Sequence, residues 1–251
     1  MKLGVHVLPK FTRDTTDRNR TSPFAFTGNK FEFRMLGSSN SIACANIMLN
    51  ATVAESLKQF ADALETTESF ESALHDLIQK TIKEHRRIIF NGNGYDDAWI
   101  KEATEVRGLL NLRTTPDAMP HLLDKKNVDM LTAHKVFTKA ELESRYEIML
   151  ENYCKTVNIE ALTMVDMAKK EILPAVEGYA KELSDAVIAK TTAVPGLACK
   201  YDKSVITKLS TLADEIDTAA AALESAANKY KTVEDVTEAS CMIRDVILQK
   251  I

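Results

Sequence analysis

Three charged residues alternate with two phenylalanines in the segment Lys30-Phe31-Glu32-Phe33-Arg34. Successive side chains of a β-strand point to opposite faces, so Lys30, Glu32 and Arg34 are predicted to share one face. Burying such a row is costly unless its charges are paired or coordinate a ligand. On spacing alone, a solvated edge strand with an internal ion pair is the simpler interpretation.

Two short strands are needed to hold this row. Phe24 and Phe26 alternate with other residues before Gly28-Asn29, and Phe31 and Phe33 do so after it. This period of two, interrupted by turn residues, predicts two strands joined by a turn or bulge. We expect the phenylalanine face to pack and the charged face to be presented.

A polar segment with two closely spaced cations, Arg18 and Arg20, precedes the strands. It could be a solvated loop, or it could contribute guanidinium groups that bind phosphate or carboxylate oxygens. The first 36 residues carry seven Lys or Arg against three Asp or Glu, whereas the whole chain has a formal charge of −4. This balance favours a small anionic ligand and argues against a nucleic-acid partner.

The rest of the chain is predicted to be helical. Apolar residues recur every three or four positions from Ile42 to Leu64 and again from Ser69 to Arg87. Thr138 and Glu141 form a capping box that begins another helix, and Pro174 should kink or split the helix that contains it.

The fold class is therefore mainly α with a small N-terminal antiparallel β portion, an α+β arrangement. We expect a β segment over residues 1–36 and a helical region over residues 37–251. Two or three short strands are rarely stable alone. They would need partner strands that this sequence does not contain.

The segment Asn91-Gly-Asn-Gly94 invites comparison with a phosphate-binding loop. It lacks the Gly-Lys-Ser/Thr ending of a P-loop, so we interpret it as a structural turn. Asp96 or Asp97 is expected to cap the helix that follows.

The four cysteines are far apart, and their spacing does not match a zinc site. They indicate a reducing compartment. The sequence shows neither a signal-peptide pattern nor an apolar run of membrane-spanning length. A cytoplasmic protein without a membrane partner is expected.

Two segments resemble glutamine synthetases of the type III class: Asp14-Thr-Thr-Asp-Arg-Asn-Arg-Thr-Ser-Pro-Phe-Ala-Phe-Thr-Gly-Asn-Lys-Phe-Glu-Phe-Arg34 and Gly37-Ser-Ser-Asn-Ser-Ile-Ala43. Further motifs continue the similarity over nearly the whole chain, among them Arg87-Ile-Ile-Phe-Asn-Gly-Asn-Gly-Tyr95, Glu102-Ala103 and Arg107-Gly-Leu-Leu-Asn-Leu112. The resemblance covers only the C-terminal part of such an enzyme. It implies that the strands complete a catalytic sheet whose other strands lie earlier in the enzyme.

The resemblance implies ATP-dependent ligation of ammonia to glutamate through a γ-glutamyl phosphate, with Mg²⁺ or Mn²⁺ as the metal. Glu32 matches a metal-binding glutamate of the family, and Arg34 matches a catalytic arginine that faces substrate and phosphate. Arg20 matches an arginine that contacts the nucleotide phosphates. Lys30 lies where other classes often have a nucleotide-contacting arginine. The complete enzyme is expected to be a homo-oligomer.

This sequence also departs from the family pattern. A second arginine of type I enzymes would fall at Ala25, and the other metal ligands of the family have no counterpart. A single carboxylate cannot hold a catalytic Mg²⁺ tightly. We therefore expect this chain to be inactive alone. The alternative is a non-catalytic helical assembly module with a vestigial site.

Overall fold

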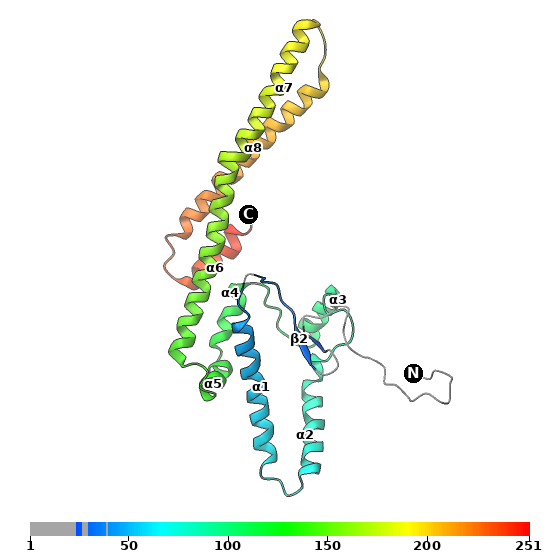
Figure 1. The fold of residues 1–251 in the computed structure, drawn as a ribbon, viewed down its shortest axis with the longest axis vertical. Coiled ribbons are helices and arrows are strands. Elements are labelled where there is room, and N and C mark those ends of the chain that lie inside the picture. Colours follow the sequence, from blue (N-terminus) through cyan, green and yellow to red (C-terminus); the bar gives the residue numbers. More distant parts are fainter. Residues whose placement is uncertain (1–23, 27–29, 39) are drawn as a thin grey trace, which may run out of the picture. The chain divides into compact units, whose positions relative to one another are not determined.

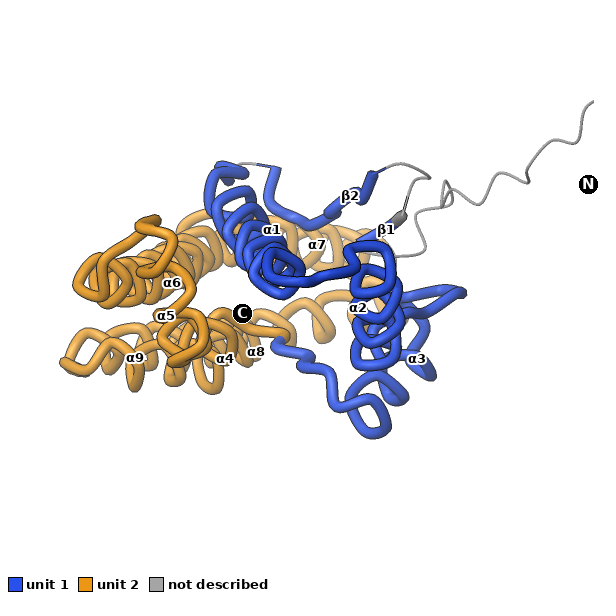
Figure 2. Tube along the Cα trace, turned by 90° about the horizontal axis from the view of Figure 1, so that it is seen from below, with its two compact units in different colours: residues 1–112 blue, residues 113–251 orange. Residues whose placement is uncertain are grey.

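A computed structural model describes residues 24–26, 30–38 and 40–251, which form two compact units, residues 1–112 and 113–251 (Figure 2). The described residues are mostly helical, with one two-stranded antiparallel sheet, so the predicted fold class is confirmed. The proposed domain limit after residue 36 marks the change from strand to helix and stays a prediction.

Unit 1 contains the short sheet and several helices. A loop connects its two long helices, α1 and α2, as seen in Figure 1. Its elements are β1 (Phe24–Phe26), β2 (Phe31–Phe33), α1 (Ala43–Leu64), α2 (Phe70–His85), the 3-10 turn η1 (Arg86–Ile88), α3 (Asp97–Lys101) and the π-helical turn η2 (Glu102–Val106).

Unit 1 buries little apolar surface. Of its described hydrophobic residues, only Ala25 and Ala51 are buried, and large side chains such as Leu57 and Ile82 on the two long helices are exposed. Helices gain most of their stability by packing an apolar face. The described part of unit 1 therefore has no substantial core of its own.

Unit 2 is built around long helices, and α7 and α8 run antiparallel beside one another (Figure 1). Its elements are α4 (Thr115–Ala118), the 3-10 segment η3 (Met119–Leu123), α5 (Lys125–Ala133), α6 (Lys139–Met167), the π-helical turn η4 (Ala168–Ile172), α7 (Leu173–Ala193), α8 (Lys200–Tyr230), α9 (Val236–Met242) and the π-helical turn η5 (Ile243–Ile247).

The start of α6 follows the predicted capping box. Thr138 Oγ1 accepts a hydrogen bond from the backbone N–H of Glu141 at 3.3 Å, and the Thr138 N–H donates to Glu141 Oε2 at 2.7 Å. These two bonds satisfy backbone and side-chain groups at the helix start. The bond from the Thr138 N–H, together with one that the Thr138 hydroxyl donates to Glu141 Oε2 at 2.9 Å, lowers the pKa of the Glu141 carboxyl group.

The core of unit 2 lies where α6 packs against α8, α9 and η5. Each element contributes buried side chains, and Ile243 and Ile247 are fully buried. The α6 members recur at three- or four-residue spacing, as one helix face requires. The cluster comprises Cys154, Val157, Ala161, Val165, Leu223, Ala226, Ala239, Ile243 and Ile247.

Pro174 does not break its helix. Residues 139–193 remain helical, and the π-helical turn η4 lies immediately before the proline. Proline has no N–H to donate to the carbonyl four residues earlier, so an α-helical bond is lost there. In the π turn, Leu173 N–H donates to Ala168 O instead. The helix is therefore not split at Pro174 but changes its hydrogen-bond register there, and the kink stays a prediction.

We predict a large difference in amide hydrogen exchange between the sheet and α6. Residues 24–26 and 31–33 belong to an isolated two-stranded sheet, whereas Leu150 and Ala161 are fully buried. The sheet amides should exchange by local opening at little free-energy cost, and the α6 amides only by global unfolding of unit 2. Mass spectrometry of the monomeric chain measures both. Equal protection of the two regions would contradict the prediction.

Candidate functional site

The predicted strands form an antiparallel hairpin. Its register pairs Phe24 with Phe33, Ala25 with Glu32 and Phe26 with Phe31. Ala25 is only 2% exposed and lies directly opposite Glu32. Ala25, which stands where type I enzymes have an arginine, is therefore the cross-strand neighbour of the candidate metal ligand.

Glu32 and Arg34 form an ion pair on the charged side of β2. Arg34 Nη2 donates to Glu32 Oε2 at 2.9 Å, and Arg34 Nε approaches the same oxygen at 3.3 Å. The Glu32 side chain is 44% exposed and that of Arg34 is 23% exposed. Within the described residues, both bonds use Oε2, so Oε1 has no hydrogen bond from a protein donor.

The other candidate residues are less closely joined to this pair. Lys30 lies one residue before β2 and its side chain is exposed. Arg20 lies outside the described residues. The structure thus brings together Glu32 and Arg34, the candidate metal ligand and the candidate catalytic arginine.

The expected packing of the phenylalanine face is not seen. Phe24, Phe31 and Phe33 remain 49%, 62% and 48% exposed. Their rings contact one another, with Phe24 stacked on Phe31 at 5.3 Å between centroids and edge-on to Phe33 at 6.3 Å. Within the described residues this sheet has only two strands, and roughly half or more of each of these side chains stays exposed.

A second group of side chains closes the segment between η1 and η2. Arg107 donates from Nη1 to the carbonyl oxygens of Arg87 at 3.1 Å and Ile89 at 2.9 Å. Arg87 donates in return from Nη1 to the carbonyl oxygens of Arg107 and Gly108, both at 3.3 Å. The two arginines therefore tie two chain segments together through backbone oxygens.

Glu102 and two aromatic rings hold Arg107 in place. Arg107 Nε lies 2.8 Å from Glu102 Oε1, and its guanidinium carbon lies 4.7 Å from the centre of the Trp99 ring. Trp99 stacks on Phe90 at 3.8 Å between centroids. We call Arg87, Phe90, Trp99, Glu102 and Arg107 the arginine clasp.

Side chains of the clasp and its surroundings constrain the turn at 91–94, which we interpret as structural. Gly92 has φ +150°, and a β-carbon there would come within 2.8 Å of the Phe90 ring. The next helix begins as expected, because Asp96 Oδ1 accepts a hydrogen bond from Ala98 N–H at 2.9 Å. The backbone around this turn is fixed by side chains of the same segment.

The sequence analysis missed the clasp. It gave neither Arg87 nor Arg107 an individual role. The available signal was the arginine–glycine pair at 107–108, near a glutamate and the only tryptophan of the chain. Reciprocal bonds to carbonyl oxygens cannot be read from such spacing.

The described residues contain no group of three His, Cys, Asp or Glu side chains that could hold a metal ion. They also contain no helix long and apolar enough to cross a membrane. Because the described residues contain no such metal-binding group, a metal bound at Glu32 would need further ligands from outside them.

Comparison with known proteins identifies the family. Residues 73–191 match the glutamine synthetase C-terminal domain. The chain is 37% identical over 252 residues to a glutamine synthetase of Butyrivibrio fibrisolvens, covering 95% of the chain and 34% of that protein. The chain belongs to the glutamine synthetase family.

Other glutamine synthetases show the same partial coverage. A type-3 glutamine synthetase of Dictyostelium discoideum is 42% identical over 190 residues, covering 74% of the chain and 26% of that protein. A glutamine synthetase of Bacteroides fragilis is 38% identical over 187 residues, covering 73% of the chain and 26% of that protein. The chain thus spans about a quarter to a third of the length of these relatives.

The matches differ in whether they cover the hairpin as well as the arginine clasp. The C-terminal domain match contains the whole arginine clasp but begins after the hairpin. The Butyrivibrio match covers 95% of the chain, so it leaves out fewer than 24 residues. Residues 24–34 therefore lie within it. The hairpin is therefore part of the similarity to a glutamine synthetase.

Replacing Arg107 with alanine should open the clasp. The change removes the bonds to two carbonyl oxygens and the cation above Trp99. We expect a loss of about 1.5 kcal/mol in local stability and greater access of acrylamide to Trp99. Trp99 is the single tryptophan, so its fluorescence reports this site alone.

The matched control is Arg86→Ala. Arg86 is a neighbouring exposed arginine in η1, and the described residues provide no side-chain bond to it. Its replacement should change stability by less than about 0.5 kcal/mol and leave quenching unaltered. Equal quenching in Arg107→Ala and the unmodified chain would show that the clasp does not order Trp99.

Proposed function

We propose that this chain supplies part of the active site of a glutamate–ammonia ligase. In this reaction, the γ-carboxylate of glutamate attacks the γ-phosphorus of ATP and ADP leaves. Ammonia then attacks the acyl carbon of γ-glutamyl phosphate, and inorganic phosphate leaves with loss of an ammonium proton to solvent. The observation that carries the proposal is the ion pair between Glu32 on β2 and Arg34 directly after it, in a segment similar to glutamine synthetases.

Glu32 is suited to be one ligand of Mg²⁺ or Mn²⁺. Both ions prefer oxygen donors, and Oε1 of Glu32 has no protein hydrogen bond within the described residues. A bound divalent ion would neutralise phosphate charge. Because one carboxylate is insufficient, we propose that the remaining ligands come from other parts of the enzyme.

Arg34 is proposed to serve two purposes. Its bonds to Oε2 orient the Glu32 carboxylate, and its guanidinium group can also face the transferring phosphoryl group. Lys30 and Arg20 are proposed to contact nucleotide phosphates. A lysine at position 30 would provide a point charge, without the paired donors of an arginine.

The wider setting is also part of the proposal. We infer that the complete enzyme is a cytoplasmic homo-oligomer that uses glutamate, ammonia and ATP, and that the isolated chain is inactive. The sparse core of unit 1 and the exposed Phe24, Phe31 and Phe33 rings support dependence on further strands. A two-stranded sheet cannot bury these rings by itself.

A chimera tests the assignment of Glu32. The chain can be joined to the part of the Butyrivibrio fibrisolvens relative that lies outside the match. In this chimera, Glu32→Gln should weaken Mn²⁺ binding and lower the ligation rate by roughly tenfold or more, because a charged ligand is lost. Mn²⁺ titration and phosphate release measure these effects.

Thermal stability alone cannot decide the role of Glu32. The pair with Arg34 is partly exposed, so its loss should cost no more than about 1 kcal/mol. Glu68→Gln, at an exposed position without an ion pair in the described chain, is the control. Unchanged Mn²⁺ affinity in an active Glu32→Gln chimera would refute metal binding, and ligation by the isolated chain would refute its proposed inactivity.

A further inference from the structure

Ala25 shares one face of the hairpin with the candidate metal ligand. It lies directly opposite Glu32 in the register of β1 and β2. Residues that face one another across an antiparallel pair point to the same side, with their β-carbons about 5 Å apart. Arg34, which pairs with Glu32 at 2.9 Å, belongs to the same side. The rings of Phe24 and Phe31 stack on the other side.

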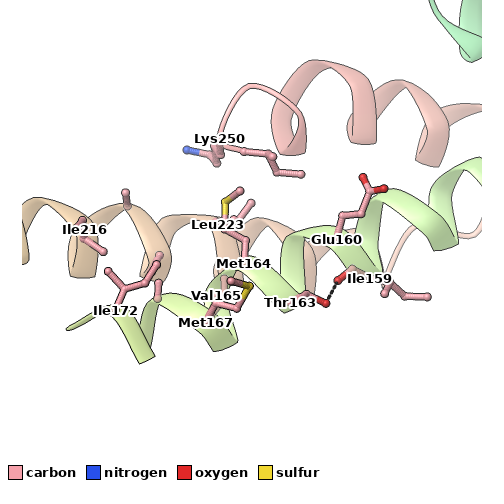
Figure 3. A pocket seen from close by; sticks show the side chains of 14 residues that line it. Ile159, Glu160, Thr163, Met164, Val165, Met167, Ile172, Ile216, Leu223 and Lys250 are labelled. Atoms are coloured by element: carbon pink, nitrogen blue, oxygen red, sulfur yellow. Dashed lines mark hydrogen bonds between the residues drawn. The ribbon is translucent and has the colours of Figure 1, made fainter. Parts of the chain in front are cut away.

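Ala25 is unusual among the buried alanines of the described residues, because it lies in a strand. All the others lie in α-helical or π-helical segments, and alanine is the most favourable residue in a helix. Ala168 and Ala220, for example, line an apolar groove between α6, η4 and α8 (Figure 3). In strands, alanine is depleted and valine is enriched. Strand formation therefore does not explain a small side chain at position 25.

The space around Ala25 is already filled. Ala25 is only 2% exposed, so a larger side chain could be added only by moving a neighbour. Glu32 is the cross-strand neighbour, and its side chain is 44% exposed and free to shift. Arg34 holds Glu32 through Oε2, which leaves Oε1 without a protein hydrogen bond within the described residues. A shifted carboxylate would present Oε1 in another direction.

We propose that Ala25 is a positioning residue, whose small side chain keeps the space in which the Glu32 carboxylate lies. Oε1 can then face a divalent ion while Arg34 holds Oε2. The inference rests on the proposed function of Glu32 as a metal ligand. Ala25 itself touches neither metal nor substrate in this arrangement, and it acts through Glu32. Replacing a group that orients a metal ligand typically lowers metal affinity about 10-fold to 100-fold.

A purely structural role for Ala25 makes the opposite prediction. If position 25 only stabilised the hairpin, metal affinity would follow strand preference, so glycine would be the more harmful replacement and valine the less harmful. If position 25 leaves space for Glu32, valine is the harmful replacement and glycine is tolerated. Size and strand preference thus rank the two replacements in opposite orders.

Ala25→Val and Ala25→Gly test this ranking in the chimera with the Butyrivibrio fibrisolvens relative, which contains the full chain. We expect Ala25→Val to raise the Mn²⁺ dissociation constant about tenfold, and Ala25→Gly to change it by less than about twofold. Mn²⁺ titration measures both constants, and thermal unfolding shows whether each variant is folded. At saturating Mn²⁺, the ligation rate of Ala25→Val should return to within about twofold of the unmodified chimera, because the reacting groups are unchanged.

Two results would overturn the positioning role directly. One is an Ala25→Gly variant that binds Mn²⁺ as weakly as Ala25→Val, since affinity would then follow the stability of the hairpin. The other is an Ala25→Val chimera that does not fold, because position 25 would then be limited by packing.

Glu32→Gln separates this inference from the proposed function. If Glu32→Gln weakens Mn²⁺ binding and Ala25→Val does not, only the positioning role of Ala25 is wrong. If Glu32→Gln leaves Mn²⁺ binding unchanged, the metal role of Glu32 is wrong, and the positioning role is wrong with it.

Discussion

The burial of one face of α6 is the interaction on which unit 2 depends. Side chains from Cys154 to Val165 pack against α8, α9 and η5 and exclude water from a single cluster. Burial of a large aliphatic side chain contributes roughly 1.5–3 kcal/mol, so such a cluster can hold several helices together. Because this face is buried, the neighbouring face of α6, with Ile159 and Met167, is exposed.

Unit 1 faces the opposite constraint. Its charged pair and its clasp are formed locally, but its described apolar residues bury almost nothing beyond Ala25 and Ala51. Polar contacts at partly exposed positions add little stability. The candidate site residues Glu32 and Arg34 therefore lie in the unit that has the smaller buried core. This distribution fits a part of an active site that other strands complete.

Local sequence signals predicted much of this arrangement. The alternation around Phe31 and Phe33 gave the strands, and Thr138 and Asp96 gave two helix starts, because these features depend on neighbours within four residues. The resemblance selected Glu32 and Arg34, although periodicity alone favoured an ion pair, which the structure also contains. Their roles in catalysis are proposals that this geometry supports.

Other features depend on contacts that spacing does not encode. The clasp joins Arg87 to Arg107 across 20 residues through backbone oxygens, and the exposure of the phenylalanines depends on which other elements lie against the sheet. At Pro174, sequence rules identify the lost hydrogen bond but not how the chain compensates. In the π turn, Leu173 N–H donates to the carbonyl oxygen of Ala168, so the turn contains one residue more than an α-helical turn.

The two oxygens of Glu32 show how an ion pair and a metal site can coexist. Arg34 engages Oε2 through two donors of one guanidinium group, so the carboxylate is oriented while Oε1 stays open to another ligand. A divalent ion at Oε1 would compete for electron density with Arg34 but would not need to displace it, because the two oxygens are distinct. In the proposed site, Arg34 would act on the metal through Glu32 and on the phosphate directly. On strand spacing alone, Glu32 and Arg34 are a structural ion pair. With a metal at Oε1, the same carboxylate would be shared between the Arg34 guanidinium group and the metal.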